Sequence, residues 1–465
     1  MRLFNTYSRA LEEFVPLDSA GREVKMYTCG PTVYSHAHIG NFRAYLFEDL
    51  LQRQLEFRGY HVHRVMNLTD VDDKTIRGCR EAGVSLSQFT APFKQAFFDD
   101  LDALRIKRAD EFPAATEARH IAAMIAMIAT LVERDLAYQA DDRSLYFRIK
   151  NFPEYGKLAH FNLDELQSTG RVKNDEYEKE NVGDFALWKA WSEADGDVGW
   201  ESPWGRGRPG WHIECSAMAT QLLGEQLDLH CGGVDNIFPH HEAEIAQTEG
   251  CTGRQFVRYW LHCAHLLAEG QKMSKSLGNF FTLRDVLARG YSGREVRYAL
   301  LRVHYRAQLN FTWEGLEEAR VALARIDGWV LRLRAAAGEE TAVSGAPDNS
   351  FADALDDDLN ISAALGVLFD RIRETNRALD TSELNPAAAR ACLDWWENLD
   401  RILAVSAMGT DPLPTEISAL AEARVQARLA KNWRGSDELR EQLAALGWEV
   451  RDTKEGQEMT RRGGS

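Results

Sequence analysis

The pattern of apolar and polar positions in the first seventy residues predicts a strand, a helix and a second strand. VKMYTC at 24–29 is rich in β-forming residues and ends at a Gly-Pro pair. Across 41–58 apolar residues recur every fourth position, and Gly59 follows where a helix commonly ends. HVHRVMNL at 61–68 then returns to a β-rich pattern. This order predicts a βαβ unit, and therefore a parallel sheet.

Later apolar runs predict the other half of that sheet. LDLHCGGVD at 227–235 ends an apolar stretch on two glycines, and RYWLHCAHLL at 258–267 predicts another strand. The chain is then expected to turn at Glu269-Gly270 into QKMSKSLGN. Residues 113–138 have helical periodicity, and the chain becomes helical again beyond residue 315.

Changes in composition predict the domain organisation. Residues 140–210 are rich in aromatic residues, charges and glycine, which predicts an insertion between the two halves of the sheet. Polar breaks at 335–350 and 409–414 separate a helical region from a small C-terminal module. We therefore expect an α/β fold, with a Rossmann-like parallel-sheet domain split by an insertion, followed by a helical bundle and a small C-terminal α+β module. The expected segments are 1–115 and 206–265 (the two halves of the sheet domain), 116–205 (insertion), 266–315 (the segment that contains KMSKS), 316–408 (bundle) and 412–465 (C-terminal module).

An acidic run precedes the helix expected from about 361 to 379. It comprises Asp356, Asp357 and Asp358, with Asn360 after them. Such residues cap helix N-termini and offset the positive end of the helix dipole. We favour that interpretation over a metal site.

Composition and charge narrow the class of protein. The 465 residues exceed what a single core accommodates, and 45% hydrophobic with 27% charged residues is typical of a soluble protein. No apolar stretch is long enough to span a membrane, and the N-terminal residues lack the apolar centre of a signal peptide. Seven widely spaced cysteines favour a reducing, cytoplasmic location over a disulfide framework. The net charge of −16 argues against a general nucleic-acid coat protein, although residues 421–465 carry a net charge of +1.

The first motif with chemical meaning is HIGN, where the first strand passes into its helix. Backbone N–H groups at a helix N-terminus favour an anion, and Gly40 permits close approach of a base or phosphate. His38 and Asn41 are able to donate to phosphate oxygens. Taken alone, HIGN is better explained by a turn with a polar rim.

The second motif, KMSKS, follows the expected turn. Lys272 and Lys275 on a loop are able to close over a polyphosphate and offset its developing charge, with Ser274 between them. A bare pair of lysines would be a solvated basic loop. The full string far downstream of HIGN in an α/β chain is specific, and the pair resembles the signatures of class I aminoacyl-tRNA synthetases.

Cys29 stands a short way ahead of the HIGN turn, where it could be core filler, a nucleophile or a metal ligand. GWHIECSAM supplies Cys215, and FPHHEAEIAQ supplies His240 and Glu244 on one helical face. Together they form a four-ligand set suited to tetrahedral zinc. Each residue singly also has an ordinary structural explanation, and we expect His241 and Glu242 on the other faces of that helix. The zinc-protease helix fails because Ile245 replaces its second histidine, and the separation of the cysteines excludes a zinc finger.

Motifs along nearly the whole chain resemble the cysteinyl-tRNA synthetase family. They are CGPTVY…HIGN, NLTDVDDK, GWHIECSAM, GGVDNIFPHHEAEIAQ, KMSKSLGN, LDDDLN and the ending KNWRGSDELREQLAALGWEVRDT. Ala243 stands where the family more often has Asn, between two of the expected ligands. The resemblance implies that Cys29, Cys215, His240 and Glu244 hold one active-site zinc, which receives the substrate thiolate.

The resemblance implies that 1–115 and 206–265 are the two halves of the catalytic domain, that 266–315 holds the KMSKS loop and the stem-contact region, and that 412–465 is the anticodon-recognition module.

The resemblance also implies roles for other residues. Trp211 is expected near the substrate, Thr69 in the pocket wall and Asp235 at the adenosine. His38, Gly40, Asn41, Lys272, Ser274 and Lys275 are expected to bind ATP, and His38, Lys272 and Lys275 to stabilise charge in catalysis. Trp433, Arg434, Arg440 and Arg451 are expected to bind tRNA through stacking and phosphate contacts.

The implied reaction has two steps. The carboxylate of L-cysteine attacks the α-phosphorus of ATP, with Mg²⁺ on the leaving pyrophosphate, and the terminal adenosine of tRNA(Cys) then accepts the cysteinyl group. Such chemistry depends on positioning and charge stabilisation, so we expect no general base. We expect a monomer without membrane association. Two rivals remain, an enzyme joining cysteine to an amino sugar, which needs no tRNA-reading module, and a catalytically inactive tRNA-binding protein.

Overall fold

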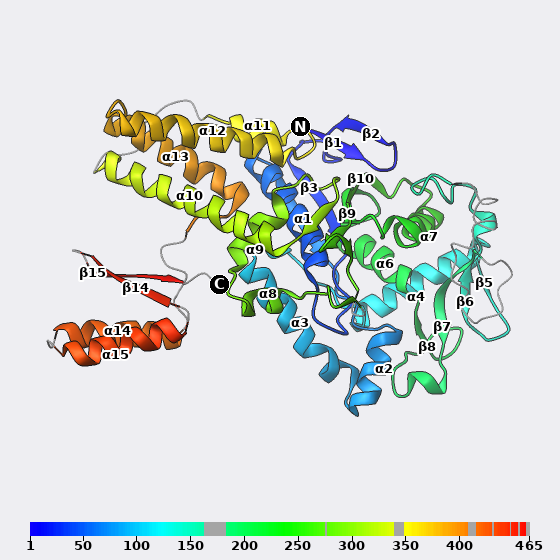
Figure 1. Cartoon of the computed structure of the whole chain (residues 1–465). Helices are drawn as coiled ribbons and strands as arrows, with labels where there is room; N and C mark the ends of the chain where they lie inside the picture. The colour runs from blue at the N-terminus through cyan, green and yellow to red at the C-terminus, as the bar shows by residue number, and fades with distance from the viewer. Residues whose placement is uncertain are drawn as a thin grey trace. The chain divides into compact units, whose positions relative to one another are not determined.

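A computed structural model gives the fold of the chain (Figure 1). It describes residues 1–161, 183–274, 277–338, 348–407, 415–429, 432–446, 448–453 and 456–461. The chain divides into two compact units, one of Met1–Leu283 with Gly293–Ala404 and one of Arg284–Ser292 with Val405–Ser465. Most of both predicted polar breaks lies outside the described residues. No helix within the described ranges is long and apolar enough to cross a membrane.

A four-stranded parallel sheet lies at the centre of the larger unit, in the order β10-β9-β3-β4. Its strands are β3 (Glu23–Thr28), β4 (His61–Met66), β9 (Leu227–Gly233) and β10 (Val257–Cys263). Most residues of these strands are buried, as expected for a parallel sheet covered on both faces. The predicted α/β class and the split parallel sheet are confirmed.

The strand predicted over 258–267 is two strands in the structure. β10 ends at Cys263, and residues Leu266–Ala268 form β11 in a different sheet. Between them, Ala264 N donates to the carbonyl of Tyr305 at 2.8 Å, which diverts the chain from the central sheet. A continuous apolar run in the sequence does not show where the chain leaves one sheet and joins another.

Helices connect and cover the central strands. α1 (Ile39–Phe57) links β3 to β4, and it begins slightly before the predicted helix because His38 serves as its N-cap. Gly59, one residue beyond the C-cap, has a φ of +89°, which explains the glycine there. The other elements around the sheet are β1 (Arg2–Asn5), β2 (Ala10–Glu13), α2 (Asp73–Ala82), α3 (Leu86–Ala103), α4 (Ala118–Glu133), α6 (Trp211–Leu223), the π-helical turn η3 (Ile237–His241) and α7 (Glu242–Thr252).

The order of the strands places a crevice between β3 and β9. From β3 the chain passes through α1 to β4 on one side, whereas from β9 it passes through α7 to β10 on the other. Loops at the carboxyl ends of β3 and β9 therefore diverge, and ligands of open α/β sheets bind at such a point. Cys29 and Asp235 stand just beyond these two strand ends.

The insertion forms an antiparallel sheet of its own, in the order β5-β6-β7-β8. Phe147 and Phe185 stack with ring centroids 5.0 Å apart and belong to the same buried cluster as Met218 and Trp260. The insertion therefore shares a core with the catalytic sheet. Its elements are β5 (Ala137–Gln139), β6 (Leu145–Phe147), η1 (Ile149–Asn151), β7 (Phe185–Ala190), η2 (Glu193–Asp195) and β8 (Gly207–Pro209).

A small sheet and a helical bundle complete the larger unit. Trp329 anchors the bundle, since its buried N–H donates to Thr375 Oγ1 at 2.7 Å and its ring packs edge-on against Trp396. In Figure 1 the three long helices α10, α12 and α13 run alongside one another. The elements are β11, β12 (Gln271–Lys272), α9 (Gly293–Leu301), β13 (Leu309–Phe311), α10 (Trp313–Ala337), α11 (Ser350–Leu355), α12 (Ile361–Asp380) and α13 (Pro386–Leu403). All but the first residue of α8 (Leu283–Ala288) belongs to the smaller unit.

The acidic run before α12 is only partly what the sequence predicted. Asn360 caps the helix, as Oδ1 accepts from Ala363 N at 3.1 Å. Asp356 instead accepts from the side chains of Gln54 and Arg58 on α1. Asp357 and Asp358 likewise bind partners near the N-terminus of the chain, so dipole compensation is the wrong interpretation for the three aspartates.

The smaller unit contains the C-terminal module, whose α+β composition is confirmed. Two helices accompany an antiparallel hairpin, and Ile417, Leu443 and Val450 form its buried centre. The elements are α14 (Thr415–Leu429), α15 (Trp433–Ala445), β14 (Trp448–Thr453) and β15 (Gly456–Arg461).

Candidate active site

A cleft of about 540 Å³ opens at the carboxyl ends of β3 and β9. Its walls come from the loop after β3, the start of α1, the loop after β9, the segment after β10 and the start of the KMSKS motif. Of the residues that the sequence predicted at ATP, five line this cleft: His38, Gly40, Asn41, Asp235 and Lys272.

The HIGN turn is held by a reciprocal capping box. His38 Nδ1 accepts from Asn41 N at 3.2 Å, and Asn41 Oδ1 accepts from His38 N at 3.1 Å. Burial lowers the pKa of His38, so its imidazole is neutral at pH 7. Because Nδ1 is an acceptor, the proton lies on Nε2, which makes that atom a hydrogen-bond donor.

The two signature motifs pack against each other at Gly40. A Cβ on Gly40 would lie 2.6 Å from the Met273 methyl group, so a larger residue would require the Met273 side chain to move. Ile39 N also donates to Phe281 O at 3.0 Å, and the ring of His38 packs edge-on against Phe280. Residues far apart in the sequence thus form one wall.

The KMSKS motif starts on the hairpin of β11 and β12. Asn279 closes the loop, since its Nδ2 donates to the carbonyls of Ala268 and Lys272 at 3.1 and 3.2 Å. Its Oδ1 accepts from Ser274 N at 2.8 Å. Ser274 is not among the residues lining the cleft, and Lys275 lies outside the described residues.

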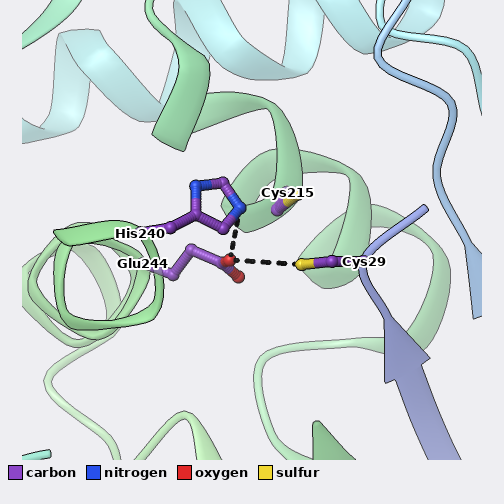
Figure 2. A group of neighbouring side chains, drawn as sticks. All are labelled: Cys29, Cys215, His240 and Glu244. Carbon is purple, nitrogen blue, oxygen red and sulfur yellow. Dashed lines mark hydrogen bonds and ion pairs between the residues drawn. The ribbon is translucent and has the colours of Figure 1, made fainter. Parts of the chain in front are cut away.

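Cys29, which lines the cleft, lies together with Cys215, His240 and Glu244 (Figure 2). Cys29 follows β3, Cys215 lies on α6, and the other two stand at the junction of η3 and α7. Their ligand atoms all lie within 4.8 Å of one another. Glu244 Oε1 is 3.1 Å from His240 Nε2 and 4.0 Å from Cys29 Sγ, and Figure 2 shows these groups facing one another.

Burial favours the uncharged forms of these four groups. The hydrogen bond with Cys215, together with burial, raises the pKa of Cys29 well above its usual range. The hydrogen bond with Cys29 lowers the pKa of Cys215, but burial and Glu244 outweigh it and the net shift is upward. Burial also raises the pKa of Glu244 and lowers that of His240 well below its usual value. A divalent cation reverses these penalties, because it stabilises thiolate and carboxylate and binds neutral imidazole.

A second set of four ligand groups overlaps the first, namely Cys29, His230, His241 and Glu244. His241 Nε2 is 3.3 Å from Cys29 Sγ, and His230 Nε2 is 2.9 Å from Glu244 Oε2. The expectation that His241 lies away from the site is therefore wrong. Glu242 is also buried, where it accepts from the backbone N–H groups of Gly156 and Ala159 at 2.7 and 2.9 Å.

Three further histidines surround the cluster, and the sequence analysis missed them. His212 Nδ1 is 2.8 Å from His240 Nδ1, and His262 Nε2 is 2.8 Å from His241 Nδ1. His230 is the third, and all three are buried. A signal was present, because His230 and His262 interrupt apolar runs that predict buried strands.

The predicted substrate residues differ in their positions. Trp211 is 46% exposed and stacks on His240, with ring centroids 4.4 Å apart. Thr69 is buried, donates to Glu214 Oε2 at 3.0 Å and accepts from Asn67 Nδ2 at 3.2 Å. Neither Trp211 nor Thr69 is among the residues that line the cleft.

The predicted tRNA residues lie in the smaller unit. Trp433 opens α15 and is 58% exposed, with the guanidinium of Arg428 5.8 Å from its ring centre. Arg440 is exposed and stands two turns along the same face of the helix. Arg434 is exposed and pairs with Glu438, and Arg451 belongs to β14.

Three family models match consecutive parts of the chain. Residues 15–321 match the tRNA synthetases class I (C) catalytic domain, and residues 350–405 match the DALR domain. Residues 410–459 match the cysteinyl-tRNA ligase anticodon binding domain.

Curated relatives match over almost their whole length. The cysteine–tRNA ligase of Chlamydia felis is 51% identical over 463 residues, which is 98% of this chain and 96% of the relative. That of Protochlamydia amoebophila is 48% identical over 466 residues, covering 98% and 97%.

Solved structures show the same fold at low identity. Mycobacterium tuberculosis methionyl-tRNA synthetase in complex with methionyl-adenylate is similar, with a TM-score of 0.60, 16% identity and coverage of 82% of this chain and 89% of that one. The LeuRS-tRNA-LeuAMS ternary complex of Agrobacterium radiobacter K84 also has a TM-score of 0.60, at 12% identity, covering 86% and 88%.

Proposed function

The chain belongs to the cysteine–tRNA ligase family of class I aminoacyl-tRNA synthetases, and from this premise we propose that one zinc ion, held by Cys29, Cys215, His240 and Glu244, selects L-cysteine. The observation that carries the proposal is the convergence of these four groups from three separate parts of the chain within 4.8 Å. A bound zinc would supply a soft Lewis acid for the thiolate of the substrate.

The donor set fits zinc. Two thiols, one imidazole and one carboxylate are donors that tetrahedral zinc accepts. Cys215, His240 and Glu244 are buried, and a bound cation would offset the cost of ionising the buried thiol and carboxylate. The overlapping set offers only one thiol beside two imidazoles. We favour the set with two thiols, because soft thiolate donors select zinc over magnesium and calcium.

The cleft above the cluster is proposed to bind ATP. His38 would donate from Nε2 and Asn41 from its amide to phosphate oxygens, beside the N-terminus of α1. Asp235, at the end of β9, would contact the adenosine. Lys272 and Lys275 would offset charge on the polyphosphate, Ser274 would bind it as well, and Mg²⁺ would accompany the pyrophosphate. One molecule of cysteine would then reach both sites, with its thiol at the ligand cluster and its carboxylate at the ATP.

The proposed mechanism relies on position and charge. The carboxylate of cysteine attacks the α-phosphorus, pyrophosphate leaves, and a ribose hydroxyl of the terminal adenosine of tRNA(Cys) accepts the cysteinyl group. Class membership favours the 2′-OH. Neutral His38 keeps its Nε2 proton throughout as a donor, and the lysines gain importance as charge develops on the leaving group. Trp211 would cover the substrate beside His240, and Thr69 would support the pocket wall through Glu214.

The smaller unit is proposed to read the tRNA. Trp433 and Arg440 would offer a stacking surface and a phosphate contact on one face of α15. Arg434 of the same helix and Arg451 of β14 would add further phosphate contacts. A rival that joins cysteine to an amino sugar would not need this module. We further propose that the protein acts as a monomer in the cytoplasm.

Metal analysis combined with cysteine-dependent ATP–pyrophosphate exchange tests the proposal. One zinc per chain is expected, and Cys215→Ala should raise KM for cysteine far more than KM for ATP. Cys392→Ala, on α13 of the bundle, is the matched control and should change neither. Purified protein with full exchange activity and no stoichiometric transition metal would overturn the proposal.

A further inference from the structure

We propose that Asp358 positions the ATP-facing wall of the cleft, and so acts in adenylate formation from the helical bundle. The inference rests on the proposed assignment of the cleft to ATP. Asp358 is the last aspartate of LDDDLN, a motif to which the active site gives no role. Its side chain is buried, with 3% of its surface exposed.

The backbone at this point is strained. Asp358 has a φ of 57° and Leu359 a φ of 55°, so two consecutive residues other than glycine adopt the left-handed conformation. Such strain persists only where the surrounding contacts impose it. The conformation lets the carboxylate point away from α12, the helix that it was expected to cap.

The carboxylate binds two segments remote in sequence. Oδ1 accepts from Phe4 N at 2.8 Å and from the Tyr305 hydroxyl at 2.7 Å. Oδ2 accepts from Arg306 Nε at 2.7 Å. The carbonyl of Asp358 lies 2.8 Å from His304 Nε2, from which it accepts. One residue thus fixes three consecutive residues of the loop that follows α9.

That loop continues directly into the cleft. The carbonyl of Tyr305 accepts from Ala264 N at 2.8 Å, and Arg43 of α1 donates to the carbonyl of His304 at 3.2 Å. Gln308 and Ala264 both line the cleft. The loop that Asp358 holds therefore contributes directly to the cleft wall.

The same segment supports the KMSKS hairpin. β13 pairs in parallel with β11, matching Leu309 to Leu266 and Phe311 to Ala268. Gly270 N, at the turn of the hairpin, donates to Asn310 Oδ1 at 2.7 Å. A shift of the segment would displace the wall and the strand that presents Lys272 together. The zinc-ligand cluster takes no residue from this segment, so the effect should fall on ATP and not on cysteine.

Asp358→Asn is the principal test, because the amide is able to replace only part of the acceptor capacity of the carboxylate. KM for ATP in pyrophosphate exchange should rise about tenfold or more, with KM for cysteine and zinc content unchanged. Asp358→Glu should recover part of the loss. Asp357→Asn is the matched control, since Asp357 is half exposed and pairs only with exposed Arg2 among the described residues, and it should change nothing.

Tyr305→Phe keeps the test decisive if Asp358→Asn fails to fold. It removes one hydroxyl but retains the stacking of Tyr305 on Phe47, and it should raise KM for ATP about threefold without affecting cysteine. Unchanged KM for ATP in the folded Asp358 variant or in Tyr305→Phe, or an equal rise for both substrates, would overturn the inference. His38→Ala, measured in parallel, separates the two levels. If His38→Ala leaves KM for ATP unchanged as well, the assignment of the cleft to ATP is wrong. If His38→Ala raises KM for ATP but the Asp358 variant does not, only the role of Asp358 is wrong.

Discussion

The Nδ1 atoms of His212 and His240 lie 2.8 Å apart, while Nε2 of His240 lies 3.1 Å from Glu244 Oε1. Only one of the two Nδ1 atoms carries the proton between them. If His240 is the donor, its Nε2 presents a lone pair to the ligand cluster, which is the form that binds a metal. An acceptor at His212 therefore selects the metal-binding tautomer of His240.

His212→Phe should weaken zinc retention by about 10- to 100-fold, because it removes the acceptor and keeps an aromatic ring of similar size. Competition with a chromophoric chelator measures the change. His212→Asn, which retains an acceptor, should lose less. His61→Phe is the control, since that side chain is 75% exposed and distant in the fold from the cluster. If the His212→Phe variant retained zinc as tightly as the unaltered protein, His212 would not select the tautomer of His240.

Lys275→Ala should slow adenylate formation by about 100-fold or more while leaving folding and zinc content intact. Its charge is needed mainly when charge develops on the leaving pyrophosphate, so kcat should fall more than KM for ATP rises. Pyrophosphate exchange with saturating ATP and cysteine measures the effect. An exchange rate like that of the unaltered enzyme would show that the second lysine of KMSKS has no part in activation.

Local patterns predicted the elements that position the site. The succession of β3 and α1, the glycine after α1 and the turn at Glu269-Gly270 before KMSKS all follow from short-range rules of periodicity and turn chemistry. His240 and Glu244 could be placed together because four residues along a helix return to the same face. Cys29 and Cys215 could be added only because thiols are suitable zinc ligands, and the family resemblance then implied the full set, since nothing local relates two cysteines so far apart.

What the sequence did not reveal depends on contacts between distant segments. Asp358 looks like a helix cap, but its partners Phe4 and Tyr305 lie more than 50 residues away. His241 was expected at the surface of its helix, yet His262 and Cys29 cover it. Such partners are set by the packing of whole elements, which the local pattern does not encode.

Glu48 predicts a dependence of stability on pH. It is fully buried on α1, and neither of its oxygens has a hydrogen-bond partner among the described residues. Burial raises its pKa from 4.5 to about 8, opposed by the charge of Arg64. The folded protein therefore keeps a proton that the unfolded chain loses above pH 4.5, and stability is lost as the pH rises through about 8.

Glu48→Gln removes this ionisation, so the variant should match the unaltered protein near pH 4.5 and become more stable by a growing margin up to about pH 8. Thermal unfolding midpoints across that range, measured for both proteins, give the difference. Glu81→Gln, an exposed residue of α2, should show no such trend. A difference that stays constant with pH would mean that Glu48 does not titrate in this way.

Removal of the chain after about residue 410 should preserve cysteine activation but reduce tRNA charging by about 100-fold or more, because stacking and phosphate contacts of the C-terminal module would be lost. Pyrophosphate exchange and tRNA aminoacylation, measured on the same preparation, separate the two steps. Trp433→Ala with Arg440→Ala in the full chain should reproduce part of the loss. Normal charging by the shortened enzyme would assign the module another role.

Discrimination against serine tests the proposed selection of cysteine most directly. Serine differs from cysteine by oxygen in place of sulfur, and an apolar pocket separates such near-isosteres by only about 100-fold. Where binding falls short of the roughly 10⁴-fold that accurate synthesis requires, synthetases add a hydrolytic editing site. The described part of the insertion is a small four-stranded sheet that shares its core with the catalytic domain, so it does not form a separate editing domain.

A zinc ion held as proposed would make editing unnecessary. A thiol ionises far more readily than a hydroxyl and is a softer donor, so it would bind zinc much more strongly at a site formed by Cys29 and Cys215. Serine should therefore be rejected by about 10⁴-fold or more in kcat/KM for pyrophosphate exchange, and mischarged Ser-tRNA should not be hydrolysed faster with enzyme than without it. Cys29→Ser should reduce the preference by weakening the same site. Efficient activation of serine by the unaltered enzyme, or rapid clearance of Ser-tRNA, would mean that the cluster at Cys29 is not the selector.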